Sequence, residues 1–458
     1  MAIKPKIKVV TNSSVDILNA LRNGLSVDYK KYVPVATADA ESIKAIGNVL
    51  MDYPAIRNSY INSLVNRIAY VTITSKLYEN HFANFKKGMF ETGETIEEVF
   101  VDLVNVYQYD PEVAEQELWK RALPNVRAAF HVMNYQKFYK LTIQRNDLRQ
   151  AFTSIGAVDS FIANLTEQIY TSAAYDEEQV FKYMTAKRIL DGFNHPETIP
   201  AVTKGNMGDI ITVIKTVSND MEFKKTKYNL AGVRNEAKKA NQYLIVSNKF
   251  DSLSDVEVLA KAFNMEKVEF LGHRVLIDGF GELDLERLAM IFDGDSNYTE
   301  FSQEELNALN EIPALLVDGS YYQIYDYIRE FTEGYNFQGL NWQYLYHVWM
   351  TWSISPFANN ALFVPGTPLV TGVTVSPAAV GAGAGQAVQL SATVETDNFA
   401  PQTINWTSDS DYATVSAAGH VVIAKDAPSQ TVIEITATAE YPNGEGEHET
   451  GTCTITVS

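Results

Sequence analysis

The chain has 458 residues, of which 46% are hydrophobic and 20% charged, and its formal net charge is −19. This length and composition predict a globular protein with two or three domains. The acidic charge, without any basic stripe, argues against nucleic acid as a bound partner, because duplex binding depends on Lys and Arg that neutralise phosphates. An acidic protein can still enclose nucleic acid by repelling it rather than gripping it.

Cysteine content and hydropathy argue against two further classes, disulfide-stabilised proteins and membrane-spanning proteins. Cys453 is the one cysteine, so an intramolecular disulfide is excluded, and this usage fits a reducing compartment. The N-terminal segment has no apolar stretch of the kind a signal peptide needs, and no run of about 18 apolar residues occurs in the chain. We therefore expect no membrane partner.

Residues 1–66 are expected to form an N-terminal arm that is extended or loosely helical. Within it, Ser14 can cap a short helix over 13–24, which Gly24 ends. The run that starts at Tyr29 is interrupted by proline, which favours extended chain.

Residues 67–108 are expected to form a long hairpin. The first strand, 67–78, alternates apolar and polar residues. The returning segment is ambiguous, because Thr95 and Glu98 have the spacing of a helix capping box whereas its valines favour a strand. A hairpin this long makes a poor stand-alone element, so we expect it to lie on a neighbouring molecule. The candidate inter-subunit contacts at its tip, which could equally be solvated, are Lys86, Lys87, Glu91 and Glu94.

Residues 110–192 are predicted to be mostly helical, with a long helix over 157–190. The apolar stripe of that helix contains Phe161, Leu165, Ile169, Val180, Phe181 and Met184. Residues 200–335 mix helices and strands. In that segment a buried strand, a turn at Asp318-Gly319 and a second strand follow one another. Two of its helices begin with the capping-box pairs Ser254–Glu257 and Ser302–Glu305.

The last part of the chain has a different pattern. "PGTPL" at 365–369 indicates a linker, and from residue 366 onward there are ten acidic residues and one lysine. Alternation with period two runs through six or seven short segments, which predicts a β-sandwich. Cys453 falls on the inward side, so its thiol is expected to be buried and inert. The predicted core of this sandwich includes Val388, Leu390, Trp406, Ile435 and Cys453.

The common catalytic, nucleotide-binding and metal-binding motifs do not occur in the sequence. There is no HExxH, GxSxG, phosphate-binding loop or paired CxxC, and the seven histidines are scattered. Two carboxylates meeting in space could still serve a glycosidase, although no pattern points to such a pair. We therefore expect no catalytic residue, no metal site, no cofactor and no enzymatic activity.

Two resemblances add to this interpretation. The tail segments "VQLSATV", "INWTSDSDYATVSAAGHVV" and "CTITV" resemble a bacterial immunoglobulin-like group 2 domain. The segments "SVDILNALRNGLSVDYKKYVPVATAD", "FKKGMFETGETIEEVFVDL", "DVEVLAKAFNM" and "GLNWQYLYHVWMTWSISPFANNALFV" resemble, in this order, the major capsid proteins of phi29-like short-tailed phages.

The second resemblance implies an α+β fold of the Hong Kong 97 type followed by an all-β immunoglobulin-like sandwich. It places an N-terminal arm at 1–66 and an E-loop hairpin at 67–108. It places the capsid core, with spine helix, peripheral domain and axial domain, at 109–365, and the sandwich at 366–458. In this family's fold the arm and the E-loop reach onto neighbouring subunits.

The function that this resemblance implies is structural. Copies of the chain would form pentamers and hexamers and close into an icosahedral or prolate phage head, with a scaffolding protein and a portal as partners. The head would enclose double-stranded DNA without binding it specifically. The acidic charge of the sandwich, rather than the resemblance, favours a position on the outer face, because an acidic domain that faced packaged DNA would repel it. The protein would reside in the virion after synthesis in the host bacterial cytoplasm. Two alternatives are an adhesin or fibre protein that binds host glycan through the sandwich, and a carbohydrate-active enzyme with an accessory sandwich.

Overall fold

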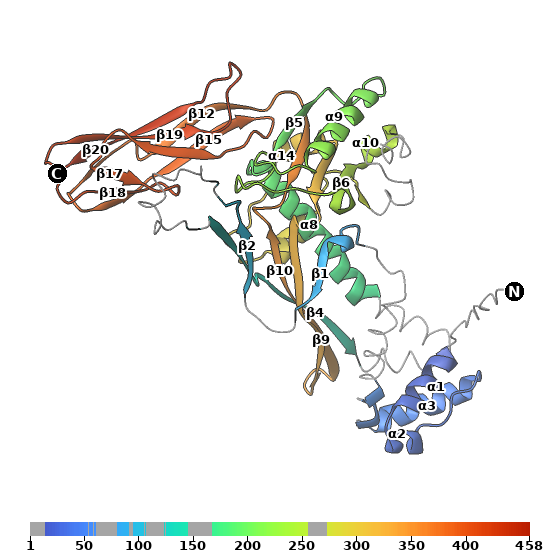
Figure 1. Ribbon diagram of the computed structural model, residues 1–458. Helices are drawn as coiled ribbons and strands as arrows, with labels where there is room; N and C mark the ends of the chain where they lie inside the picture. Colours follow the sequence, from blue (N-terminus) through green and yellow to red (C-terminus); the bar gives the residue numbers. More distant parts are fainter. Residues whose placement is uncertain are drawn as a thin grey trace.

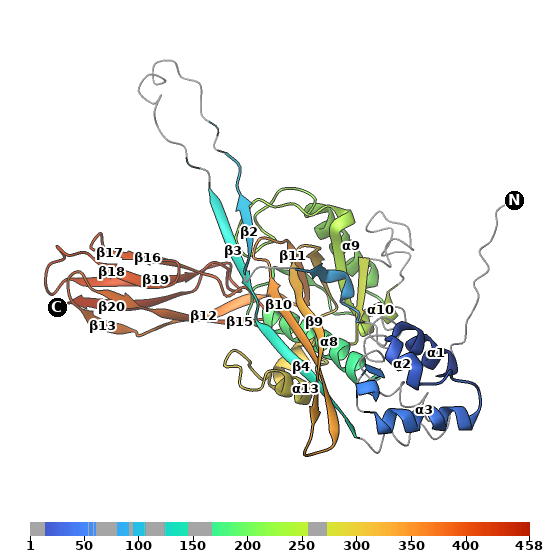
Figure 2. The same cartoon turned by 90° about the horizontal axis from the view of Figure 1, so that it is seen from below.

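The computed structural model describes residues 14–53, 55–57, 59–60, 80–90, 95–104, 106, 123, 125–144, 167–254 and 273–458. These residues form a helical N-terminal unit, a body of helices and sheets, and a C-terminal β-sandwich. The N-terminal helices and the sandwich lie on opposite sides of the body (Figures 1 and 2). The predicted order, an α+β part followed by an all-β part, is confirmed.

The N-terminal unit contains three helices, α1 Ser14–Gly24, α2 Val27–Tyr32 and α3 Ala40–Asp52. Ser26 and Asp39 cap the second and third helices through their side chains. Their apolar faces share one core, into which Ile143 and Tyr344 of the body also pack. The extended run predicted from Tyr29 is wrong in its first residues, because the Ser26 cap starts α2 and Tyr29 is drawn into this core.

The described part of the body contains a four-stranded and a five-stranded sheet besides a two-stranded ribbon, and the spine-like helix α8 packs on the four-stranded sheet. That sheet has the order β1–β9–β10–β4, with bounds Lys86–Met89, Tyr322–Asn336, Asn341–Ile354 and Tyr135–Gln144. The helix α8, Ser172–Leu190, follows a π-helical turn at Glu167–Thr171. Of the predicted stripe, Ile169, Val180 and Phe181 are buried and Met184 is partly buried. Phe161 and Leu165 lie outside the described residues.

The second sheet has the order β5–β11–β8–β6–β7. Its strands are Pro196–Ile199, Asn360–Pro365, Ala314–Asp318, Gln242–Ser247 and Arg274–Ile277. Among the described residues, the body's other helices are α9 Met207–Asp220, α10 Asn248–Leu253, α13 Leu285–Ile291 and α14 Gln303–Asn310, with 3-10 turns at Ala83–Phe85 and Lys239–Asn241. The capping box of Ser302 and Glu305 is confirmed, as is the turn between β8 and β9. The other predicted box cannot be compared, because Glu257 lies outside the described residues.

The predicted helical character of 110–192 is wrong over 126–144, which contains the strands β3 Val126–Val132 and β4 Tyr135–Gln144. In β4 every second side chain, from Tyr135 to Ile143, faces inward. The whole strand pairs antiparallel with β10 over ten residues, and this pairing overrides local helix propensity.

The predicted hairpin at 67–108 needs a correction in its pairing. Its C-terminal part is a strand, β2 Thr95–Val101, but β2 pairs antiparallel with β3 over its full length. The segment expected to pair with it, 67–78, lies outside the described residues. The segment expected at its tip contains β1, which joins the first sheet in parallel beside β9. The two-stranded element that leaves the body is therefore the β2–β3 ribbon (Figure 2).

The sandwich begins directly after β11, since Gly366, Thr367 and Pro368 alone separate Pro365 from the first sandwich strand. Its strands form groups of two, four and three, in the orders β12–β15, β13–β20–β19–β16 and β14–β18–β17. The bounds, from β12 to β20, are Leu369–Ser376, Ala379–Ala382, Ala387–Gln389, Ser391–Asp397, Ile404–Ser408, Ala413–Val415, His420–Ile423, Val432–Ala439 and Thr450–Val457.

Candidate assembly site

The β2–β3 ribbon has two chemically different faces. Directly paired residues share a face, so the alternation along both strands separates them. The outer face is mostly apolar, and its large apolar side chains are 50–63% exposed: Val99, Val101, Val126, Phe130 and Val132. A contiguous apolar surface of this kind on a projecting element is typical of a protein–protein contact.

The inner face attaches the root of the ribbon to the body. Phe100 stacks on Phe357, with ring centroids 5.7 Å apart. The buried imidazole of His131 lies 2.8 Å from Ser353 Oγ and 3.1 Å from Glu98 Oε2. The Ser355 hydroxyl donates to the other oxygen of Glu98 at 2.9 Å. The ribbon therefore leaves the body in a direction that buried side chains determine.

Helix α8 fixes the neighbouring elements through consecutive polar side chains that are nearly all buried. Arg287 of α13 binds both oxygens of Asp176, at 2.7 and 2.9 Å. Glu177 faces the first sheet, and Glu178 accepts from the His81 backbone N–H at 3.2 Å. The Lys182 ammonium donates to the Glu282 carbonyl at 2.8 Å. Side chains around this helix thus connect it to three parts of the chain, at residues 81–86, 282–287 and 329.

Lys86 belongs to this cluster and does not lie at a hairpin tip. Its Nζ is 2.9 Å from Glu177 and 3.2 Å from Asp326. Arg329 pairs with the same two carboxylates. Burial alone would lower the pKa of the Arg329 guanidinium, but Glu177 and Asp326 raise it well above its usual range. The four groups form a closed, charge-balanced network inside the subunit.

Lys87, Glu91 and Glu94 have different positions. The Lys87 ammonium donates to the Gly319 carbonyl at 2.8 Å, and burial lowers its pKa despite the opposing effects of Asp318 and Glu98. Glu91 and Glu94 lie outside the described residues. The tip location predicted for the two lysines is wrong, because β1 is built into the first sheet. The acidic run of α8 was missed, although three consecutive acidic residues within the predicted helix were a visible signal.

The residues named for the sandwich core lie together. Leu390, Trp406, Ile435 and Cys453 are buried in one apolar cluster, and Val388 packs against it partly buried. Burial raises the pKa of the Cys453 thiol, which keeps it protonated and unreactive.

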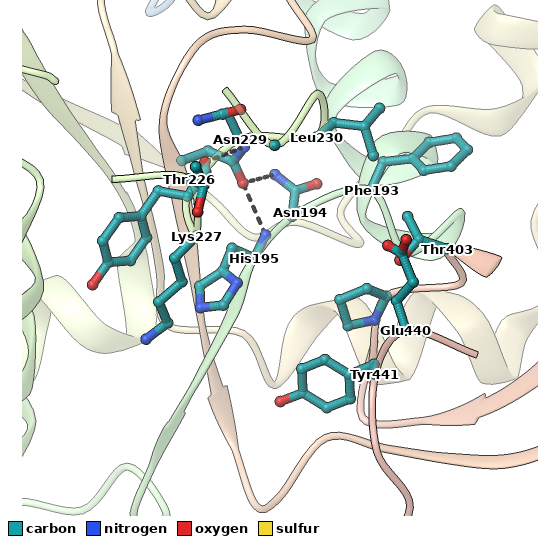
Figure 3. Close-up of a pocket in the computed structure, with 15 residues that line it drawn as sticks. Phe193, Asn194, His195, Thr226, Lys227, Asn229, Leu230, Thr403, Glu440 and Tyr441 are labelled. Carbon is teal, nitrogen blue, oxygen red and sulfur yellow. Dashed lines mark hydrogen bonds between the residues drawn. The ribbon is translucent and has the colours of Figure 1, made fainter. Parts of the chain in front are cut away.

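A pocket of about 240 Å³ lies at the seam between body and sandwich (Figure 3). Phe193, His195 and Lys227 line it from the body, and Glu440 and Tyr441 line it from the sandwich. His195 and Lys227 both bind Glu197, at 3.2 and 2.6 Å, so these basic groups already have a partner.

Within the described ranges, His, Cys, Asp and Glu side chains do not gather in any group of three that could hold a metal ion. Across the same ranges, no helix has the length and apolarity that a membrane crossing requires.

The comparisons with known proteins now decide the family. The sequence profile of the family described as Phi29-like phage major capsid protein matches residues 18–364. The chain belongs to this family. The profile of the bacterial Ig-like domain (group 2) matches residues 369–447, which covers most of the sandwich.

Curated relatives agree over nearly the full length of this capsid protein. It is 32% identical to the major capsid protein of Bacillus phage B103, over 95% of this chain and 93% of the relative. It is 31% identical to that of Bacillus phage PZA, over 93% of this chain and 90% of the relative. A capsid structure of Staphylococcus phage Andhra aligns with a TM-score of 0.48 and 16% identity, covering 64% of this chain and 87% of that one.

Membership in this family gives the chain a structural role in a phage capsid, as the sequence predicted. A capsid protein acts as many copies in a virion, so homo-oligomeric assembly follows. The comparisons support the capsid role and not the adhesin alternative.

Proposed function

We propose that the chain is the repeating subunit of a phage head, with pentamers and hexamers that close into an icosahedral or prolate shell around double-stranded DNA. The observation that carries the proposal is the exposed apolar face of the β2–β3 ribbon in a member of a capsid-protein family. That face docks on a second copy of the chain. The net charge of −19 suits a wall that encloses DNA without gripping it.

The described elements suggest how the Hong Kong 97-type parts are assigned. The β2–β3 ribbon is the E-loop, in place of the hairpin at 67–108, because it projects from the body and carries the apolar face (Figure 2). Helix α8 is the spine helix, and the two sheets belong to the peripheral and axial domains. The helices α1 to α3 form the described part of the arm.

Other parts of the proposal rest on the family and on charge. A scaffolding protein and a portal are expected partners, and synthesis takes place in the host cytoplasm. The protein acts as a structural element without enzymatic activity. The sandwich faces outward, because its ten acidic residues against one lysine would repel packaged DNA on the inside. Glu91 and Glu94 stay candidate contacts with a neighbour, whereas Lys86 is engaged within its own subunit.

A substitution on the outer face of the ribbon tests the docking step. Phe130→Glu places a charge in the middle of the proposed contact and leaves the inner face unchanged. We expect the yield of closed shells, counted by electron microscopy after co-expression with the scaffolding protein, to fall about tenfold or more. The matched control is Phe337→Glu, because Phe337 is an exposed aromatic residue in the turn between β9 and β10, at the end of β10 opposite to Ser353, which contacts the ribbon.

The outcome separates docking from folding. Both variants should retain the thermal stability of the unassembled wild-type chain, since both aromatic rings are already in solvent. Normal shells from Phe130→Glu would remove the ribbon from the assembly contact. Equal loss from both variants would show that the ribbon has no special role.

A further inference from the structure

The turn between β15 and β16 has a backbone that its sequence does not favour. The Ala400 N–H donates to the Asp397 carbonyl at 3.3 Å, and both central residues have positive φ, 50° at Asn398 and 59° at Phe399. Turns of this type favour Asn and Gly at the central positions. Asn398 fits this rule, but an aromatic residue with positive φ is strained. An interaction outside the turn must therefore hold Phe399 in place.

That interaction lies across the seam. The Phe399 ring belongs to the sandwich by sequence, yet it packs against the hydrophobic core cluster of the body that α8 helps to form. The next residue, Ala400, is completely buried. The turn therefore places an apolar side chain of one domain, partly buried, against the core of the other.

The C-terminal end of α8 is shaped to receive this turn. The helix ends in a Schellman motif, in which the N–H groups of Gly192 and Phe193 donate to Ile189 and Arg188 at 3.0 and 3.2 Å. Gly192 has a φ of +67°, and a Cβ atom there would lie 2.7 Å from the Ala400 carbonyl oxygen. Glycine is therefore required at this position both by the helix end and by the docked sandwich.

Polar contacts complete the arrangement. The Gln402 side chain donates to the Leu190 carbonyl at 3.4 Å, and this carbonyl is one of those that a helix end leaves without a partner. The Asn398 side chain donates to the Thr367 carbonyl of the linker at 3.1 Å. The linker predicted from the sequence is thus held by the same turn.

We propose that residues 397–402 form a docking plug that locks the sandwich to the C-terminal end of α8, so that the sandwich and the spine helix move as one body. The sandwich is then a fixed extension of the body rather than a tethered appendage. A displacement of α8 within the subunit carries the sandwich with it. This inference concerns the single subunit and does not rest on the proposed assembly.

Phe399→Gly distinguishes a plug from an ordinary turn. Glycine relieves the positive φ, so a residue that serves only the turn would leave hydrogen exchange at the seam unchanged. A plug predicts the opposite effect in the full-length unassembled chain. Hydrogen exchange of residues 188–196 and protease cleavage within 366–368 should both accelerate about tenfold. Gln430→Gly is the matched control, since Gln430 also has a positive φ but lies elsewhere in the sandwich.

A second pair of variants approaches the seam from the side of the body. Gly192→Ala meets both the positive φ and the Ala400 oxygen, whereas Gly232→Ala meets a φ of +61° with open space around it. Only the first should accelerate cleavage within 366–368.

Hydrogen exchange at Val432–Ala439 reports whether the sandwich itself stays folded. If Phe399→Gly also unfolds that strand, the glycine pair decides the question. Cleavage rates within about twofold of wild type in both Phe399→Gly and Gly192→Ala would overturn the proposal.

Discussion

The interior of the body around α8 and the core of the sandwich differ in the chemistry of their buried side chains. Around α8, charged side chains are buried and paired, among them Asp176, Glu177 and Lys182. In the sandwich, which is described throughout from residue 366 to 458, the buried side chains are apolar. An apolar core tolerates substitution by side chains of similar volume. A buried ion pair is stabilising only when its two charged groups keep a specific geometry.

This difference suits the two positions in the subunit. The sandwich has to fold and to present a surface, and for that an alternating apolar core is sufficient. The body has to hold a long ribbon and a spine helix in a defined relative orientation. Ion pairs from α8 to β1, β9 and α13 connect the elements whose geometry matters for a shell.

The largest expected effect is at Glu177. Glu177→Ala leaves the ammonium of Lys86 and the guanidinium of Arg329 partly buried with one carboxylate, Asp326, between them. Breaking a buried pair by removing one partner destabilises a protein by about 3–5 kcal/mol. Denaturant titration of the unassembled chain should show a loss of this size.

The control for this prediction is Glu304→Ala, which removes an exposed glutamate from the first turn of α14. Its effect should stay within about 0.5 kcal/mol. If Glu177→Ala lowered the unfolding free energy as little as the control does, the ion-pair network would not stabilise the body. The proposed difference between the body and the sandwich would then be wrong.

A slightly smaller effect is expected in the sandwich from Ile435→Ala. The side chain is completely buried beside Trp406 in the apolar cluster, and such truncations cost about 2–5 kcal/mol of unfolding free energy. Val432→Ala in the same strand should have almost no effect, since Val432 is exposed. Replacement of Ile435 by Val should recover most of the loss, which an apolar core allows and a network of fixed charges does not.

The sequence predicted the sandwich well and the body only in part, and the same contrast explains why. Strand alternation is a local signal, so it placed Leu390, Trp406 and Cys453 on the inward side without knowledge of their neighbours. The capping box at Ser302 is equally local, and it was found for that reason.

Apart from the missed Ser26 cap of α2, the errors concern partners that are distant in the chain. Lys86 was assigned to a hairpin tip because its partners, Glu177 and Asp326, lie about 90 and 240 residues away. The segment of β2 was left open between helix and strand, and its pairing with β3 could not be predicted from periodicity, which does not specify register between remote segments. The role of Phe399 could not be predicted either, because phenylalanine rarely adopts a positive φ and the sequence therefore gives no sign of this backbone conformation.

The smallest effect predicted here is a pH dependence at Glu197, in β5 of the body. Burial alone would raise the pKa of this carboxyl, but hydrogen bonds from His195 and Lys227 and the charge of Lys227 outweigh burial and lower it. A depressed pKa in the folded state stabilises the protein above the unfolded value, near 4.5. That stabilisation is lost as the pH falls through the folded value.

Glu197→Gln should therefore be less stable than wild type at pH 6, and the difference should shrink steadily below about pH 4.5. Denaturant titrations of both chains across this range measure it. Ile435→Val in the sandwich serves as the reference, because its small difference from wild type involves no titrating group and should stay constant over the same range. A Glu197→Gln difference that stayed equally constant would mean that the carboxylate contributes through packing alone. The body would then depend on shape as the sandwich does, at least at this edge of its second sheet.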